Sequence, residues 1–279
     1  STGEPDADLR RLNAMPAHQW LAVPDELLVV LDTALRVGVQ SNGAFDVGVG
    51  DLVDAWGFGP SGPMPDEGRA RALKAHAHHP ASDVLEIDLV QKRVRKRAAI
   101  TLDLSGIAKG YGVDALAGCL DGFGITRYLV GIDGEMRAKG HKPDGQAWAI
   151  AIEKPVVDVR EVMGVMELAD AAIATSGTYR HWVEVAGTQH AHTMSPSARQ
   201  PVCNRLASVT VVMPSCMLAA VSVVATSAML ADAWATALLV LGETAGVELA
   251  QARGMDALFV VRDGDDFQQI SIVEGERQR

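Results

Sequence analysis

The sequence predicts an α+β fold, with mixed or antiparallel sheets and packed helices. Alternating apolar residues over Val84–Leu89 and Arg93–Arg97 predict two strands that pair as a hairpin. Apolar residues at helical spacing predict an amphipathic helix over Asp25–Gln40. Further strands and helices interleave with several hairpins along the chain, which favours α+β over a regular doubly wound sheet.

The remaining elements follow from the same patterns. Strands are predicted over Arg127–Ile132, Trp148–Ile152, Glu161–Leu168, Trp182–Val185, Val209–Met213 and Ala257–Val261. A short helix is predicted over Glu67–Ala77, a long one over Ala228–Leu241 and a last one over Thr244–Arg253. The charged residues of Arg93–Arg97 are most simply the exposed face of the hairpin.

Composition excludes some classes of function. The chain has 279 residues, 35 of them acidic and 25 basic, for a net charge of −10. A nucleic-acid partner is not expected, because binding the phosphate backbone requires a basic surface. Three cysteines without CxxC spacing predict no disulfide framework. The chain opens at Ser1 without a charged or apolar leader, which we interpret as a processed or trimmed product.

The segment Asp103–Asp114 is the strongest single motif. Its pattern predicts a strand end, a tight turn at Ser105–Gly106 and a helix with Lys109 in its first turn. Unpaired N–H groups and the helix dipole attract phosphate at such a terminus, and a lysine adds a full positive charge. Asp103 would supply an acceptor for a ribose, a base or a metal-bound water. A purely structural strand–turn–helix fits the same residues.

Asp232 and Thr236 lie four residues apart on the predicted long helix, so they share one face. A carboxylate and a hydroxyl on one face can bind a hard cation such as Mg²⁺. The flanking residues are apolar, so an aspartate there is costly unless it is paired or coordinating. The alternative is a helix-start aspartate, with Thr236 bonding back to the preceding turn.

Histidines offer two further candidates. His192 follows a predicted hairpin over Trp182–Gln189, and its imidazole could act as a general base, or equally be a satisfied residue at a strand end. The cluster His76, His78 and His79 is interpreted as a solvated helix end rather than a metal site, because no cysteine or carboxylate supports it.

One internal repeat is visible. Val209–Ala220 and Val221–Asp232 agree at seven of twelve positions. A single repeat of this length is too short for a solenoid. We interpret residues 209–232 as a tandem duplication that acts as an insertion.

In order along the chain, these motifs resemble those of the ApbE-type flavin transferases, the FAD:protein FMN transferases. The resemblance rests on Gly43–Asp46 with Trp56–Gly59, Asp103–Asp114, Gly134–Arg137 with Gly140, Ala174–Gly177, His192–Pro196 and Ala231–Ala237. It implies a single ApbE-like domain over residues 1–279, related to the T-fold and lacking the family's N-terminal strand. It also implies a Mg²⁺-dependent enzyme that cleaves FAD, passes FMN to a threonine or serine of a partner flavoprotein, and releases AMP.

The resemblance also assigns roles to residues. FAD would be bound by Ala44, Phe45, Asp46, Asp103, Lys109 and the backbone near Met194. Mg²⁺ would be bound by the Gly106 carbonyl, Asp232 and Thr236, and His192 with Asp232 would be catalytic. The acceptor would be a subunit of a respiratory or electron-transfer complex, in the periplasm or at the outer face of a bacterial inner membrane. Membrane attachment would need an N-terminal anchor that this chain lacks.

Departures from the family pattern support an alternative function. Gly3 stands where the family usually has an aromatic residue, and Ser195 replaces an aspartate. The duplication directly precedes Asp232. The alternatives are a protein of this family that binds FAD or only hydrolyses it to FMN and AMP, or a scaffold without catalysis.

Overall fold

The computed structural model describes residues 7–157, 160–185, 187–214 and 227–278. The chain divides into two compact units, each made of two separate stretches. Unit 1 contains residues 1–105 and 181–203, and unit 2 contains residues 106–180 and 204–279. Both contain helices and antiparallel strands, which confirms the predicted α+β class. That residues 1–279 form one domain stays a prediction.

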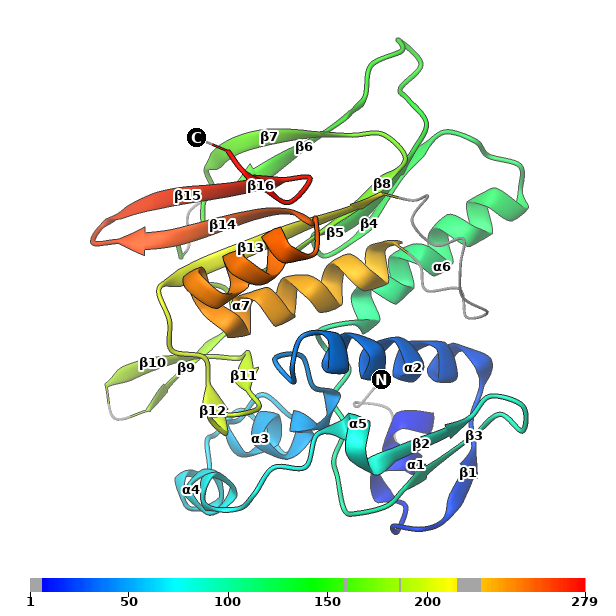
Figure 1. Cartoon of the computed structure of the whole chain (residues 1–279), viewed down its shortest axis with the longest axis vertical. Coiled ribbons are helices and arrows are strands. Elements are labelled where there is room, and N and C mark those ends of the chain that lie inside the picture. Colours follow the sequence, from blue (N-terminus) through cyan, green and yellow to red (C-terminus); the bar gives the residue numbers. More distant parts are fainter. Residues whose placement is uncertain (1–6, 158–159, 186, 215–226, 279) are drawn as a thin grey trace. The chain divides into compact units, whose positions relative to one another are not determined.

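Unit 2 is built on a seven-stranded sheet (Figure 1), whose strands are antiparallel in every pair. Their order is β16-β15-β14-β13-β8-β5-β4. The strands are β4 (Tyr128–Ile132), β5 (Glu135–Lys139), β8 (Ala171–Gly177), β13 (Leu206–Pro214), β14 (Asp256–Asp263), β15 (Asp266–Val273) and β16 (Glu276–Arg277).

The two faces of this sheet are covered differently. Besides the sheet, unit 2 contains the hairpin of β6 (Trp148–Glu153) and β7 (Val162–Leu168), and the helices α6 (Ala108–Gly122) and α7 (Ser227–Ala252). On β8, Ala171 and Ile173 join an apolar cluster with the hairpin, whereas Ala172 clusters with Ala228 of α7. Because successive side chains of a strand point to opposite faces, the hairpin covers one face and the helices the other.

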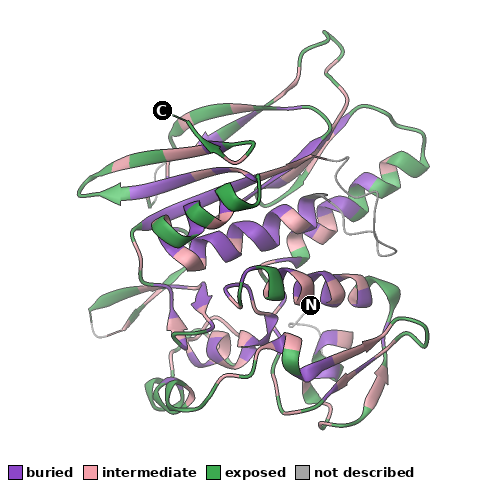
Figure 2. Ribbon diagram, viewed as in Figure 1, coloured by how far each residue is buried: buried purple, intermediate pink, exposed green. Residues whose placement is uncertain are grey.

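The helix α7 is the core helix of unit 2. By length and composition it could cross a membrane, but most of its most apolar stretch is buried within the protein (Figure 2), as in the core helix of a globular fold. The sequence predicts two helices here, and the structure has a break where they meet. Gly242 interrupts α7 with a φ of 83°, which a glycine adopts without steric cost.

Unit 1 combines short helices with a three-stranded antiparallel sheet of order β1-β3-β2. The helices are α1 (Asp8–Ala14), α2 (Asp25–Gln40), the 3₁₀ turn η1 (Val47–Val49), α3 (Gly50–Ala55), α4 (Glu67–Ala75) and α5 (Ala81–Val84). The strands are β1 (Trp20–Ala22), β2 (Leu85–Asp88) and β3 (Arg93–Lys96), with two further hairpins, β9 (Trp182–Val185) with β10 (Thr188–Ala191) and β11 (Met194–Ser195) with β12 (Gln200–Pro201).

Several local predictions can be compared with these elements. The helix Asp25–Gln40 has the predicted ends, and β2 pairs with β3 as the predicted hairpin. The interpretation of the charged run on β3 as an exposed face is wrong for Lys96, which is buried and donates to the Asn13 carbonyl at 2.9 Å. Side chains of a strand alternate between faces, so one of the basic residues is turned inward.

Candidate functional site

The predicted site residues fall in both units. Unit 1 holds Ala44, Phe45, Asp46, Asp103, His192 and Met194, and unit 2 holds Gly106, Lys109, Asp232 and Thr236. The structure gives the geometry of each group within its own unit.

The Asp103–Asp114 motif forms the predicted helix start, but not the predicted strand. Residues 101–104 have no regular structure, and a turn over 105–107 leads into α6 at Ala108. Lys109 lies in the first turn, as predicted. The first four N–H groups of a helix have no partner within the helix, so partners from elsewhere decide what this terminus can bind.

One of these partners is Asp232. Its Oδ2 accepts a hydrogen bond from the backbone N–H of Gly110 at 2.9 Å, and the residue is only 3% exposed. The pKa of Asp232 is raised to about 7, mainly by burial and further by the negative charge of Glu135. The hydrogen bond from Gly110 and the positive charge of Lys109 lower the pKa, but by less. A carboxyl group held this way favours an added positive charge beside it.

Gly110 is also a point of close approach between α6 and α7. A β-carbon at this position would lie 2.3 Å from the Ala228 carbonyl oxygen and 2.7 Å from the Met229 α-carbon. No real side chain tolerates such contacts without a backbone shift. The glycine therefore lets the first turn of α7 lie against the first turn of α6, which brings Asp232 to Gly110.

Asp114 fixes the start of α7. Its two carboxylate oxygens accept from the backbone N–H groups of Ala228 at 3.3 Å and Met229 at 2.8 Å, and Arg137 donates to Oδ1 at 2.7 Å. A carboxylate at a helix N-terminus satisfies unpaired donors and complements the dipole. Asp232 follows Ala228 by one helical turn. Within the described residues, α7 therefore holds Asp232 against α6 despite the duplication that precedes it; residues 215–226 of that duplication lie outside the described residues.

We expect Asp114→Ala to destabilise the protein by about 3 kcal/mol, because it leaves the half-buried Arg137 unpaired and uncaps α7. The matched control on the same helix is Asp121→Ala, whose ion pair with Lys139 is solvent-exposed and contributes below about 1 kcal/mol. Urea unfolding midpoints measure both. Equal losses in the two variants would contradict the anchoring role of Asp114.

Thr236 lies one turn after Asp232 on α7, so the two share a face as predicted. Its hydroxyl is hydrogen-bonded to the Ser176 hydroxyl of β8 at 3.0 Å. Ser176 belongs to the Ala174–Gly177 motif, and its contact with Thr236 was not predictable from the sequence. The pair leaves lone pairs on the Thr236 oxygen, whichever hydroxyl donates.

Lys109 is held by Glu135, an acidic residue of the Gly134–Arg137 motif for which the sequence predicted no role. Its ammonium donates to Glu135 Oε1 at 2.9 Å, and Asp133 lies 3.9 Å away. Burial lowers the pKa of Lys109, but the hydrogen bond and charge of Glu135, together with the charges of Asp232 and Asp133, outweigh it and raise the pKa. Glu135 is 1% exposed, burial raises the pKa of its carboxyl group, and its Oε2 has no hydrogen-bond partner among the described residues.

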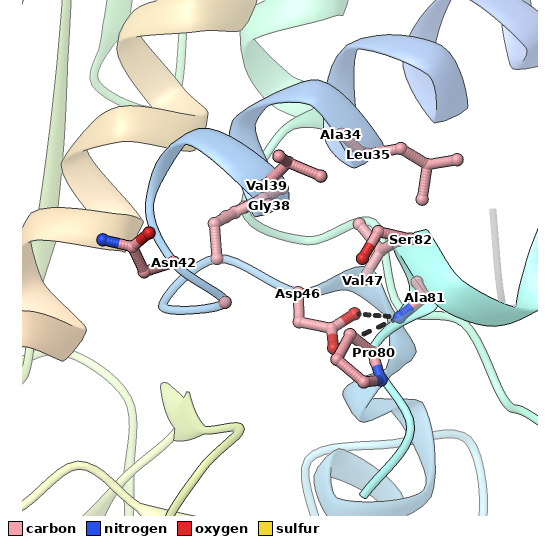
Figure 3. Close-up of a pocket in the computed structure, with 12 residues that line it drawn as sticks. Ala34, Leu35, Gly38, Val39, Asn42, Asp46, Val47, Pro80, Ala81 and Ser82 are labelled. Atoms are coloured by element: carbon pink, nitrogen blue, oxygen red, sulfur yellow. Dashed lines mark hydrogen bonds between the residues drawn. The ribbon is translucent and has the colours of Figure 1, made fainter.

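In unit 1 the Phe45–Asp46 loop borders a cavity of about 200 Å³ (Figure 3). Its walls come from the C-terminal half of α2, the loop 42–47 and residues 80–82. The Asp46 side chain is almost fully buried, and its carboxylate accepts from Gly48 N at 2.7 Å and Ala81 N at 3.1 Å. Because these bonds occupy the carboxylate, a ligand contact at Asp46 would come mainly from the backbone.

Asp103 lies beside this loop. Its backbone N–H donates to the Val47 carbonyl at 2.8 Å. Its carboxylate accepts from the N–H of Ser105 at 2.6 Å and from the Ser105 hydroxyl at 3.0 Å. Asp103 is thus bonded to Val47, the residue after Asp46, and its carboxylate holds its own turn; its role in binding FAD stays a prediction.

His192 follows the β9–β10 hairpin, as predicted. Its Nδ1 lies 3.2 Å from the His181 carbonyl oxygen, which can only accept, so Nδ1 carries the proton. In the neutral ring Nε2 is then the basic nitrogen. The ring packs edge-on against Phe58 and His181. Met194 is buried on β11, two residues further along the chain.

Comparison with known proteins gives a consistent result. The ApbE family model matches residues 1–220 and, a second time, 214–259, and the two matches overlap inside the duplicated segment. The FAD:protein FMN transferase of Vibrio cholerae is 39% identical over 274 residues, which cover 96% of this chain and 77% of that protein. The Escherichia coli enzyme of the same name is 32% identical over 270 residues, which cover 96% of this chain and 74% of that protein.

Solved structures agree. The flavinyl transferase ApbE of Pseudomonas stutzeri, in its apo form, superposes with a TM-score of 0.81 at 36% identity, over 99% of this chain and 81% of that one. The Vibrio cholerae flavin transferase ApbE gives a TM-score of 0.80 at 38% identity, over 97% of this chain and 82% of that one. The similarity therefore extends over both units.

Proposed function

Because this chain belongs to the ApbE family of flavin transferases, we propose that it is a Mg²⁺-dependent FAD:protein FMN transferase. A threonine or serine hydroxyl of the acceptor attacks the FMN phosphorus of FAD. The new P–O bond is a phosphoester, the pyrophosphate P–O bond breaks, AMP leaves, and the hydroxyl proton passes to a base. The names of the relatives give FAD as the donor, FMN as the group transferred and a protein as the acceptor; the metal, the acceptor residue and the leaving group belong to the proposal.

One observation carries the proposal: the first turn of α6 in unit 2 holds both Lys109 and the Gly110 N–H that binds the buried Asp232 carboxylate. The helix terminus and the ammonium both attract phosphate, and the buried carboxylate attracts a cation. Phosphoryl transfer depends on positioning and on neutralising the charge of the phosphates. An acidic protein with this cluster can therefore bind a phosphate ester at one place.

The residues present fit Mg²⁺. Its preferred ligands are oxygens, and it usually retains water or takes substrate phosphates for its other positions. Asp232 would supply a carboxylate, Thr236 a hydroxyl and Gly106 a carbonyl oxygen. Ser176 orients the Thr236 hydroxyl through their hydrogen bond. When bound, Mg²⁺ would neutralise charge on the pyrophosphate as it is cleaved.

In unit 1 the cavity beside Phe45 would receive part of FAD. Its volume of about 200 Å³ suits a single ring system, below the roughly 300–1,000 Å³ of pockets that enclose a whole ligand. Ala44, Phe45 and the backbone of Asp46 would form its FAD-contacting wall, with Asp103 beside them. The basic Nε2 of His192 suits it to accept the proton of the acceptor hydroxyl.

The acceptor is proposed to be a subunit of a respiratory or electron-transfer complex. The proposed compartment is the periplasm or the outer face of the inner membrane. Both proposals rest on the family resemblance.

Incubation with FAD, MgCl₂ and a flavoprotein subunit that carries the target threonine tests the function. Covalent flavin on the acceptor, together with one AMP for each FMN attached, supports transfer. AMP release without flavin on the acceptor would identify an FAD pyrophosphatase instead, and FAD binding without AMP release a binding protein. We expect His192→Ala to slow transfer at least about a hundredfold while FAD binding changes little; an equal loss of both would indicate that His192 packs against the ligand.

A further inference from the structure

Arg199 has an unusual backbone conformation inside unit 1. It lies in the turn between β11 and β12 with a φ of 54°, in the left-handed region, yet it is only 8% exposed. A non-glycine residue in this region costs about 1–2 kcal/mol, so such a residue persists where its surroundings hold it.

Hydrogen bonds from the guanidinium keep the backbone of Arg199 in this conformation. Arg199 donates through Nη1 to His78 Nδ1 at 3.0 Å, through Nη2 to Asp51 Oδ2 at 3.0 Å, and through Nε to the Leu73 carbonyl at 3.4 Å. One side chain thereby joins the β11–β12 turn to α3, to α4 and to the segment that follows α4.

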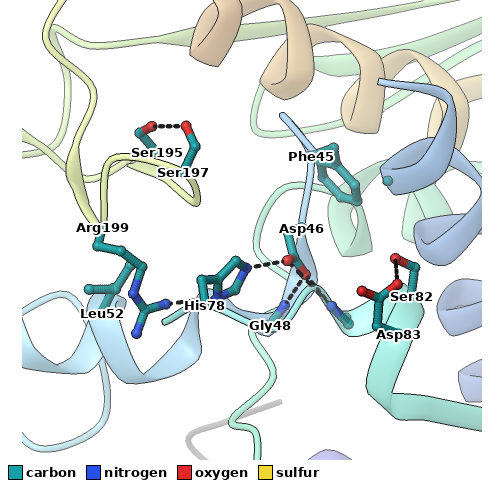
Figure 4. Close-up of polar contacts among 12 residues, drawn as sticks. Phe45, Asp46, Gly48, Leu52, His78, Ser82, Asp83, Ser195, Ser197 and Arg199 are labelled. Atoms are coloured by element: carbon teal, nitrogen blue, oxygen red, sulfur yellow. Dashed lines mark hydrogen bonds and ion pairs between the residues drawn. The ribbon is translucent and has the colours of Figure 1, made fainter. Parts of the chain in front are cut away.

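These contacts also determine the state of His78. Arginine can only donate, so His78 Nδ1 must accept and the ring proton lies on Nε2. Nε2 then donates to Asp46 Oδ2 at 2.6 Å (Figure 4). The interpretation of His78 as part of a solvated helix end is therefore wrong. Asp51, Arg199, His78 and Asp46 form one continuous series of hydrogen bonds, named here the Arg199 network.

The Arg199 network ends at the cavity wall. Asp46 accepts from the backbone of Gly48 and Ala81, and both the loop of Asp46 and Ala81 line the cavity. Arg199 itself closes the turn that follows β11, the strand that contains Met194, through a backbone hydrogen bond to Ser195. We propose that Arg199 is a positioning residue for FAD: it acts through His78 and Asp46 on the shape of the cavity wall. The inference rests on the proposed function, because it takes FAD as the ligand of this cavity.

The decisive variant is Arg199→Gly. Glycine adopts a φ of 54° without strain, so the variant removes the Arg199 side chain with its guanidinium and adds no strain to the backbone of the turn. We expect the Kd for FAD, measured by quenching of flavin fluorescence without acceptor, to rise about fivefold or more. We expect the KM for FAD to rise in parallel, and kcat to change less than about threefold, because preorganisation of the binding site is what the variant loses.

Two further variants separate positioning from stability. His78→Leu removes both the donor to Asp46 and the acceptor for Arg199, so it interrupts the same series of hydrogen bonds as Arg199→Gly. The double variant that also carries Arg199→Gly should therefore bind FAD as tightly as the single variant with the lower affinity. Such non-additive effects are expected for residues of one network. The control is Arg69→Ala, which removes another guanidinium of unit 1 from its half-exposed pair with Asp54; its Kd for FAD should stay within twofold of the native value.

Each outcome decides the inference. A Kd within twofold of the native value in Arg199→Gly, or fully additive effects in the double variant, overturns it. Failure of the proposed function is distinguishable, because it would appear as a native protein that binds FAD but transfers no FMN. A native protein that binds no FAD overturns both. The ¹⁵N shifts of the His78 ring give a check without activity: they should show a proton on Nε2 alone in the native protein and change in Arg199→Gly.

Discussion

Replacing Asp232 by asparagine is expected to abolish Mg²⁺-dependent FMN transfer while leaving the fold intact. An asparagine Oδ1 can still accept from the Gly110 N–H, so the contact between α6 and α7 is kept. The negative charge is lost, and a carbonyl and a hydroxyl alone bind Mg²⁺ weakly. Mutating a residue that only hydrogen-bonds to a metal ligand already lowers metal affinity or activity by about 10–100-fold. Because Asp232 would be a ligand itself, we expect kcat/KM to fall by more than a hundredfold.

Stability measurements separate this effect from misfolding. The pKa of Asp232 is raised to about 7 from a usual 3.8. A carboxyl group with a raised pKa in the folded state favours folding while it is protonated. Its contribution is complete below about pH 4 and is lost as the pH rises through about 7. Without Mg²⁺, the native protein should therefore lose stability across this window, and Asp232→Asn should lose less.

Thermal melts with and without MgCl₂ and FAD complete the test. The native protein should gain stability from MgCl₂ with FAD above pH 7, where Asp232 is ionised, and gain progressively less as the pH falls below 7. Asp232→Asn should show no MgCl₂-dependent gain at any pH. The control is Glu243→Gln, which neutralises another acidic residue of the same helix and should behave like the native protein. Full activity in Asp232→Asn would show that the metal assignment is wrong.

Local sequence patterns predicted those parts of the site that lie within one element. Lys109 in the first turn of α6 follows from the turn that precedes it, and the shared face of Asp232 and Thr236 follows from their spacing. The helix over Asp25–Gln40 was predicted for the same reason. In each case the residues that decide the structure are a few positions apart in the chain.

Partners distant in sequence were not predictable in this way. Glu135 meets Lys109 across 26 positions, and Asp114 meets Met229 across 115. Nothing in the spacing of these residues indicates such contacts, although the family motifs contain Glu135 and Asp114. The strand β8 was also missed, because Ala171–Ala174 has low strand propensity and becomes a central strand through burial on both faces.

Among the glycines of the described part of the chain, Gly110 should be the one whose replacement by alanine is most damaging, although alanine is normally the better helix former. Its β-carbon would lie 2.3 Å from the Ala228 carbonyl oxygen, which belongs to backbone and cannot rotate away. Overpacking of this kind costs about 1–3 kcal/mol, more than the roughly 0.5–1 kcal/mol gained by replacing a helical glycine. The strain falls on the turn of α7 that precedes Asp232.

The same helix provides the control. Gly118 is exposed on α6, and a β-carbon there meets no atom within 4 Å. Gly118→Ala should therefore raise stability by about 0.5–1 kcal/mol and leave transfer unchanged. Gly110→Ala should lower the urea midpoint, and it should lower kcat/KM by about a hundredfold, because displacing a catalytic group by about 1 Å has effects of that size. If both variants gain stability and keep full activity, the close approach of α6 and α7 is not what places the Asp232 carboxylate. Other contacts in unit 2 would then have to hold Asp232 in place despite the duplication over residues 209–232.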